Sequence, residues 1–166
     1  MDFRNINRAS DKDNYSVPPM EQILQAVSRS EMFSLLDGFS EYNQVLVAEP
    51  DRLKTTFQTK WGTFVFRRMP FGLINAGATF QRAMDIAFRG LIEQSVVVYL
   101  DDVTVFSKHR GDHLHHFRQI FERCRKYGIS LNPKKSVFVV SEGNLLGHII
   151  TRNGIVVDPE RAKVIA

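Results

Sequence analysis

Val96-Val97-Val98-Tyr99-Leu100-Asp101-Asp102-Val103-Thr104-Val105-Phe106 consists of two apolar runs that are separated by a pair of acidic residues. Runs rich in β-branched and aromatic residues are typical of buried strands. Neighbouring side chains of a strand point to opposite faces, so both acids can serve one site only if the chain turns tightly between the runs. The sequence therefore predicts a hairpin with two negative charges at its tip.

A third acid, Asp37, ends the apolar run Met32–Asp37 and precedes Gly38, a residue that lets the backbone approach a ligand closely. Unpaired carboxylates held close together repel each other, and such a cluster usually persists because a cation neutralises it. If the two segments are neighbours in one sheet, they form a site for two Mg²⁺ ions, with Mn²⁺ as an alternative. Two metals about 3.5–4 Å apart support phosphoryl transfer. The competing interpretation is that all three acids are ordinary turn residues.

Composition limits the class of protein. The chain has 166 residues, 43% of them hydrophobic, and 13 Phe, enough for one domain with a substantial core. A net charge of +4 is compatible with a polyanionic partner. The single cysteine, Cys124, excludes an internal disulfide and a multi-cysteine zinc site. No apolar run reaches membrane-spanning length and no signal peptide is recognisable, so we expect a soluble intracellular protein without a membrane partner.

Periodicity predicts the remaining elements. Helices are expected over 20–29, from a cap at Asn75 to about Leu91, and from a cap at Asp112 to Gly128. A hairpin is expected within 54–68, around Lys60-Trp61-Gly62. Strands are expected over 137–140 and 145–150, followed by a turn at Asn153-Gly154 and a helix that begins at Asp158. This mixture of hairpins and helices favours an α+β fold over a doubly wound parallel sheet.

Five blocks, taken together, resemble in order and spacing the conserved blocks of reverse transcriptases, most closely those of gypsy-type long-terminal-repeat retrotransposons. They are Asp2-Phe3-Arg4-Asn5-Ile6-Asn7, Leu35 to Tyr42, Met69 to Gln81, Tyr99-Leu100-Asp101-Asp102 and Leu145-Leu146-Gly147-His148. The resemblance covers essentially residues 2–165. It implies a palm whose antiparallel sheet is backed by helices, joined to partial fingers, with the thumb absent. The approximate division is 1–30 and 43–72 fingers-like, 31–42 and 73–142 palm, 143–157 primer-grip hairpin, and 158–166 the start of a truncated thumb or connection.

The resemblance also implies an activity, RNA-directed DNA polymerisation by two-metal-ion nucleotidyl transfer. Its implied catalytic and metal-binding residues are Asp37, Asp101 and Asp102, with the Gly38 carbonyl in the metal shell and Lys135 protonating pyrophosphate. The alternative for Lys135 is a solvated lysine or a phosphate contact.

Other positions are implied to bind substrate. The implied nucleotide-binding residues are Tyr42, Phe71, Gly72 and Arg4, and the implied primer grip is Leu146, Gly147 and His148. Tyr42 matches the aromatic residue that excludes a ribose 2′-hydroxyl; its alternative is a core tyrosine. The implied partners are an RNA or DNA template with primer, deoxynucleoside triphosphates, and the remaining polymerase segments, thumb and ribonuclease H.

Two further groups have competing interpretations. Four histidines, His109, His113, His115 and His116, lack the spacing of a zinc site and are expected on the polar face of their helix. The basic and aromatic residues around Trp61 are expected either to contact template or to pack against one another. Because the chain begins at the Asp2 block, the preceding fingers strands are expected to be missing. The alternative function is therefore a catalytically inactive retroelement remnant that at most binds nucleic acid.

Overall fold

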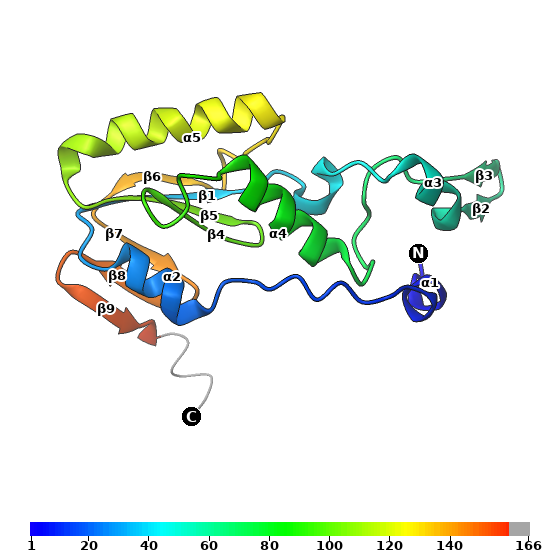
Figure 1. Cartoon of the computed structure of the whole chain (residues 1–166), viewed down its shortest axis with the longest axis horizontal. Helices are drawn as coiled ribbons and strands as arrows, with labels where there is room; N and C mark the ends of the chain where they lie inside the picture. The colour runs from blue at the N-terminus through cyan, green and yellow to red at the C-terminus, as the bar shows by residue number, and fades with distance from the viewer. Residues whose placement is uncertain (160–166) are drawn as a thin grey trace.

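A four-stranded antiparallel sheet, ordered β4-β5-β1-β6, forms the centre of the molecule in the computed structural model, which describes residues 1–159 (Figure 1). The strands are β1 Met32–Asp37, β4 Val96–Tyr99, β5 Asp102–Ser107 and β6 Val137–Val140. Strands β1 and β5 are paired along their full length, from Met32 opposite Ser107 to Asp37 opposite Asp102. The predicted hairpin of β4 and β5 and the predicted strand β1 are confirmed.

Each face of this sheet is covered by a separate apolar cluster. Helices α4 (Ala76–Ala87) and α5 (His113–Tyr127) cover one face, and side chains such as Phe80, Met84 and Ile120 fill the space. Helix α2 (Met20–Val27) covers the other face together with a second sheet. That sheet consists of β7 Glu142–Leu145, β8 His148–Thr151 and β9 Gly154–Val157. Burial on both faces explains why β1 and β5 have near-continuous apolar sequences.

A smaller group of elements lies at the end of the molecule opposite to β7–β9 (Figure 1). It contains helices α1 (Arg4–Ala9) and α3 (Glu49–Arg52) and the hairpin of β2 (Phe57–Thr59) and β3 (Gly62–Phe64). Its rings pack on one another, with Phe57 5.2 Å from Phe66 and Phe3 6.0 Å from Phe66 between centroids. Short 3₁₀ turns lie at Glu41–Gln44, Leu53–Thr55 and Arg110–Asp112.

The structure confirms the α+β class and an antiparallel sheet backed by helices, with corrections to individual elements. Helix α2 ends at Val27 rather than at residue 29, α4 ends at Ala87 rather than near Leu91, and the predicted strand 145–150 is split by a turn. The side chains of Asn75 and Asp112 make no helix-capping hydrogen bond. Asn75 Oδ1 instead accepts a hydrogen bond from the Asp13 amide at 2.9 Å, because tertiary contacts compete for the same atom.

Two further expectations concern the C-terminal end and the membrane. The helix expected from Asp158 lies, from residue 160 onward, outside the described residues. Within 1–159, every helix is too short or too polar to cross a lipid bilayer.

Candidate active site

The three predicted acids lie at one end of the central sheet. Asp37 and Asp102 are direct partners across β1 and β5, so their side chains emerge on the same face. Asp102 also pairs with Tyr99, which leaves Leu100 and Asp101 as a two-residue turn. The Gly38 amide donates a hydrogen bond to the Asp101 carbonyl at 3.3 Å. The tight turn predicted from the paired acids is therefore present, and it lies against the end of β1.

A buried glutamine holds this turn. Leu100 has a φ of 55°, a left-handed conformation that costs a residue with a Cβ about 1–3 kcal/mol. Gln81 of helix α4 accepts a hydrogen bond from the Leu100 amide at 2.8 Å and donates one to the Val98 carbonyl at 3.3 Å. Sequence reasoning assigned Gln81 no role, although an amide among the apolar positions of a helix is a recognisable signal.

The end of the sheet is electrostatically negative. The pKa of Asp102 is raised, first by burial and then by the charges of Asp101 and Asp37. The pKa of Glu41 is also raised, by burial and then by Asp101 and Asp37, while Lys135 acts in the opposite direction. Lys135 Nζ lies 3.8 Å from Asp37 Oδ2, so its ammonium partly compensates the cluster. A cation at this position would relieve the same repulsion.

The donor chemistry of this cluster fits Mg²⁺, which prefers carboxylate and carbonyl oxygens. The arrangement is not a preformed ligand set, however. Among residues 1–159, no three His, Cys, Asp or Glu side chains are arranged to hold a metal ion. A Cβ added to Gly38 would make only ordinary contacts, 3.7 Å from the Asp101 carbonyl oxygen, so no contact within residues 1–159 requires glycine there.

The loop that carries Lys135 is fastened to the end of β1. The Asp37 amide donates to Ser136 Oγ at 3.1 Å, and the Asn132 amide donates to the Asp37 carbonyl at 2.8 Å. Ser136 Oγ in turn donates to the Asn132 carbonyl at 2.7 Å. These bonds explain how a residue almost a hundred positions away is brought beside Asp37. Sequence reasoning missed both Asn132 and Ser136.

A cavity of about 280 Å³ opens beside Asp37, Asp102 and Lys135. Its opposite wall is formed by Gly143, Asn144 and Leu145 of strand β7. Beyond that wall, Leu146 and Gly147 have φ values of 51° and 78°, as a two-residue type I′ turn requires, and Leu145 pairs with His148. The predicted primer-grip residues therefore form a tight hairpin turn that continues from the cavity wall.

Tyr42 packs between two other aromatic rings. The Tyr42 ring centroid is 5.2 Å from that of Phe71 and 5.7 Å from that of Phe80. The pKa of Tyr42 is raised by burial and then by the charges of Asp101 and Glu41. Phe71 is 49% exposed. These two predicted nucleotide-binding residues are in contact with each other.

Gly72 and Arg4 make contacts within the chain itself. Gly72 has a φ of 98°, and a Cβ there would lie 3.1 Å from Phe3 Cδ2, so it permits close approach to a ring of the chain. The Arg4 guanidinium, at the start of helix α1, is 81% exposed, is paired with Asp2 at 2.6 Å and lies outside the acidic cluster. The nucleotide-binding roles that the resemblance implies for these two residues stay predictions.

The histidine prediction is wrong for His113, which is 3% exposed rather than on a polar face. Its two ring nitrogens lie 2.9 Å from Ser34 Oγ and from Ser107 Oγ. In the β2–β3 hairpin the phenylalanines pack together, whereas Trp61 is 78% exposed with Lys60 Nζ 4.4 Å from its ring centroid. The packing expectation is confirmed for these phenylalanines, and contact of Trp61 with template stays a prediction.

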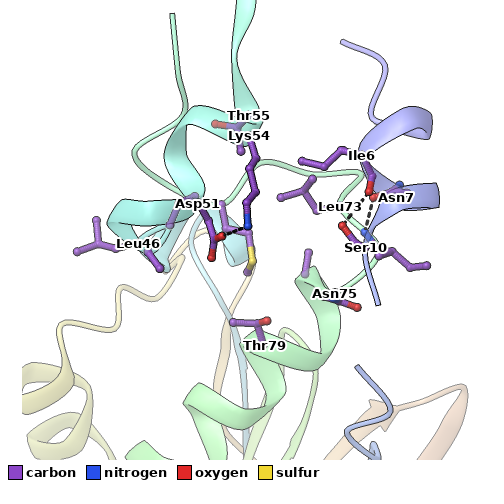
Figure 2. A pocket seen from close by; sticks show the side chains of 15 residues that line it. Ile6, Asn7, Ser10, Leu46, Asp51, Lys54, Thr55, Leu73, Asn75 and Thr79 are labelled. Atoms are coloured by element: carbon purple, nitrogen blue, oxygen red, sulfur yellow. Dashed lines mark hydrogen bonds and ion pairs between the residues drawn. The ribbon is translucent and has the colours of Figure 1, made fainter. Parts of the chain in front are cut away.

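A larger pocket of about 380 Å³ lies away from the acids, where residues of α1 and α3 face the start of α4 (Figure 2). Its polar side chains are bonded within the chain. Lys54 pairs with Asp51 at 2.5 Å, and Asn7 bonds to the Gly72 carbonyl at 2.8 Å and to the Ile74 amide at 2.9 Å. The charged residues of this pocket, Lys54 and Asp51, are thus paired with each other, whereas Asp37 and Asp102 lie among like charges.

Comparison with known proteins identifies the family. The family described as "Reverse transcriptase (RNA-dependent DNA polymerase)" matches residues 1–150. The chain belongs to the reverse transcriptase family. It is 36% identical over 165 residues to the retrovirus-related Pol polyproteins from transposons 297 and gypsy of Drosophila melanogaster. These alignments cover 99% of this chain and 16% of each polyprotein. They confirm the predicted resemblance to gypsy-type elements.

Solved structures confirm the reverse transcriptase fold. The foamy viral protease-reverse transcriptase in complex with RNA/DNA hybrid has a TM-score of 0.85 and is 22% identical, with 99% of this chain and 22% of that chain covered. A related foamy viral structure in complex with double-stranded DNA has a TM-score of 0.88 over 99% of this chain and 29% of that one. At this identity the likeness concerns the fold.

Proposed function

We propose that this chain forms the polymerase site of a gypsy-type reverse transcriptase and catalyses template-directed nucleotidyl transfer. The observation that supports this most strongly is the register of β1 and β5, which sets Asp37 directly opposite Asp102 beside the Asp101 turn. In this reaction a primer 3′-hydroxyl attacks the α-phosphate of a deoxynucleoside triphosphate and pyrophosphate leaves. The reaction requires concentrated positive charge where the negative charge develops.

The carboxylates of Asp37, Asp101 and Asp102, with the Gly38 carbonyl, are the groups that would hold two Mg²⁺ ions, or Mn²⁺ in their place. When bound, the ions would activate the attacking oxygen and stabilise the leaving one. The chain's own contribution is to hold the acids together, since the Leu100 turn is fixed by Gln81 and the end of β1 by Ser136. The Lys135 ammonium, 3.8 Å from Asp37, is positioned to donate a proton toward pyrophosphate.

Substrate selection is proposed for the surrounding residues. Tyr42, held between Phe71 and Phe80, would act as a steric wall against a ribose 2′-hydroxyl, and Phe71 and Gly72 would line the nucleotide pocket. The turn at Leu146, Gly147 and His148 would position the primer terminus. Arg4 has the least support, because its guanidinium is already engaged by Asp2.

The proposed partners are an RNA or DNA template with its primer and deoxynucleoside triphosphates. The foamy viral relatives were solved with RNA/DNA hybrid and with double-stranded DNA, which supports nucleic acid as the partner. The chain spans 16% of the length of the transposon polyproteins, so thumb and ribonuclease H segments are further proposed partners. The separation of α1 and β2–β3 from the central sheet supports the proposed division into fingers (1–30, 43–72), palm (31–42, 73–142) and primer grip (143–157), whereas α2, which lies within 1–30, packs on the central sheet.

The decisive experiment is primer extension on an RNA template with Mg²⁺, comparing the chain with its Asp101→Asn and Asp102→Asn variants. We expect incorporation by the unaltered chain and a loss of at least about a hundredfold in each variant, because electrostatic stabilisation of this kind contributes several kcal/mol. Equal incorporation by all three proteins would refute the proposal.

A second candidate is an inactive retroelement remnant that binds nucleic acid, supported by the exposed Trp61 and Lys60 pair. It predicts template–primer binding that weakens as the salt concentration rises, without incorporation. Asp101→Asn together with a further variant, Trp61→Ala, tests this candidate, since binding through the hairpin would persist in Asp101→Asn and weaken in Trp61→Ala.

A further inference from the structure

Strand β6 contains a bulge opposite Ser34. Phe33 of β1 pairs with Val140, but Leu35 pairs with Val137, so three steps along β6 correspond to two along β1. One extra residue is therefore accommodated in β6. The bulge includes Val139, whose φ of 54° is unusual for a β-branched residue and costs about 1–3 kcal/mol.

This bulge decides which residue of β6 pairs with Leu35, and therefore where the turn that carries Lys135 leaves the sheet. The ladder ends at the pair Leu35–Val137; beyond it the amides of Lys135 and Ser136 donate to the Asn132 carbonyl, and this turn holds Lys135 Nζ 3.8 Å from Asp37 Oδ2. A regular ladder from Phe33–Val140 would pair Leu35 with Phe138 instead and shift the start of the turn by one residue. Because side chains alternate between faces, Val137, which lines the cavity together with Asp37 and Lys135, would then point to the opposite face of the sheet.

A buried hydrogen-bond network fixes the bulge. The Val139 amide donates to Ser34 Oγ at 3.0 Å, and Ser34 Oγ lies 2.9 Å from His113 Nε2. On the other side of the ring, His113 Nδ1 lies 2.9 Å from Ser107 Oγ, which is 2.8 Å from His116 Nδ1. Ser34, Ser107 and His113 are all buried.

One arrangement of protons satisfies every atom of this network. A serine hydroxyl has one proton and two lone pairs; a Ser34 lone pair accepts from the Val139 amide, and the Ser34 proton is satisfied when it is donated to His113 Nε2. His113 then carries its proton on Nδ1 and donates to Ser107, which donates to His116. In this arrangement His113 fixes the direction of the Ser34 hydroxyl, and the Ser34 lone pair stays aimed at the bulge.

We propose that His113 is a positioning residue which, through Ser34, maintains the β6 bulge and so sets the point at which the turn that carries Lys135 leaves the sheet beside Asp37. The significance for catalysis rests on the proposed polymerase function. The claim that His113 and Ser34 maintain the bulge does not rest on that function, because the register of β6 can be measured without any reaction.

The test uses the whole chain, with NMR as its first readout. In the unaltered protein we expect contacts across the sheet between Leu35 and Val137, a slowly exchanging Val139 amide, and a His113 protonated on Nδ1. In Ser34→Ala, which removes only a hydroxyl, and in His113→Ala, we expect the Val139 amide to exchange at least about five times faster. We further expect the Leu35 contact to move from Val137 to Phe138.

Two variants complete the design. His115→Ala, on the exposed side of the same helix, is the matched control and leaves the spectrum of β6 unchanged. His113→Gln, whose amide oxygen can replace Nε2 as an acceptor, restores much of the Val139 protection. Unchanged Val139 exchange and Leu35–Val137 contacts in both Ser34→Ala and His113→Ala would overturn the proposal.

Primer extension is the second readout. If Lys135 acts through this register, Ser34→Ala and Lys135→Ala each lower the maximal rate by a similar factor, with little change in KM for the nucleotide. The double variant is no slower than Lys135→Ala alone. If the effects of the two substitutions on the rate were fully additive, Ser34 would act independently of Lys135, and the link to catalysis would be overturned. Absence of extension by the unaltered chain would count against the proposed function, and the NMR result would still decide the register.

Discussion

At the scale of single residues, the acids of this site are held by polar side chains buried in apolar surroundings. Gln81 accepts a hydrogen bond from the amide of Leu100, a residue with a positive φ. His113 contacts Ser34, whose hydroxyl accepts a hydrogen bond from the amide of Val139, a second residue with a positive φ. Buried polar groups are costly unless they are bonded, so each of these contacts is specific in geometry. Replacing one partner leaves the other unsatisfied.

We expect Gln81→Leu to lower the free energy of unfolding by about 1–3 kcal/mol, because the Leu100 amide and the Val98 carbonyl lose their buried partner. Urea denaturation measures this change. The matched control is Gln25→Leu, on the exposed side of α2, which should change stability by less than about 0.5 kcal/mol. Equal effects of the two substitutions would show that Gln81 does not support the turn.

The burial of His113 leads us to expect that stability depends on pH. Its pKa lies below the ordinary value of 6.5, because burial and then the charge of His116 disfavour the protonated ring. Arg110, which lines the same pocket, adds a second positive charge. The unfolded chain therefore binds more protons than the folded one, and stability falls as the pH drops below 6.5 toward the folded pKa.

Urea midpoints measured between about pH 7.5 and pH 5.5 test this expectation. We expect the midpoint to fall over this range in the unaltered chain, and to fall less in His113→Gln, which cannot titrate. Parallel curves for the two proteins would assign the pH dependence to the other histidines.

At the scale of elements, the packing of β7 against β1 brings the β7–β8 hairpin close to the acids. Gly143 makes this approach possible, since a Cβ there would lie 2.6 Å from Leu35 Cδ1. The sequence offers no sign of this, because nothing local distinguishes Gly143 from an ordinary turn glycine. Its importance comes from a strand more than a hundred residues away.

We expect Gly143→Ala to destabilise the protein by about 1–3 kcal/mol, the usual cost of overpacking. Adding Leu35→Ala should recover part of this loss, because the double variant removes the overlapping atoms. Gly111→Ala is the control, as a Cβ there meets nothing within 4 Å. Denaturant unfolding of the unaltered protein, Gly143→Ala, Leu35→Ala and the double variant measures the coupling between the two positions. Simple additivity of the two substitutions would contradict the steric explanation.

At the scale of the whole molecule, two apolar clusters sandwich the central sheet, and the acids lie where that sheet ends. The cluster on the α4 and α5 side contains the single cysteine, Cys124, which is 4% exposed. Burial raises the pKa of its thiol to about 11. A thiol in this environment is both inaccessible and protonated at neutral pH.

The rate at which Cys124 is alkylated should therefore measure how often helix α5 separates from the sheet. We expect alkylation at about pH 8 to be at least a hundredfold slower in the folded chain than in denaturant, since the thiolate forms only after opening. Mass spectrometry follows the reaction. Rapid modification of the native protein would indicate that α5 does not pack stably on the sheet.

Much of the architecture was predictable from particular stretches of sequence. The β-branched runs on either side of Asp101 and Asp102, the apolar run that ends at Asp37, and the helical spacing of Phe80 and Met84 are local signals, and each became the expected element. Element ends were less predictable. Helices α2 and α4 both end before the predicted residue, and the capping side chain of α4, Asn75, is bonded to the Asp13 amide instead.

The sequence by itself determined the strands and helices and the three acids that mark the site, because periodicity and turn chemistry act over a few residues. The tertiary structure alone decided that Asp37 faces Asp102, that Lys135 lies beside Asp37 and that His113 is buried. Register and burial depend on contacts between distant segments, such as the bond from Asp37 to Ser136 across 99 residues. A one-residue bulge is enough to turn a side chain from one face of a sheet to the other.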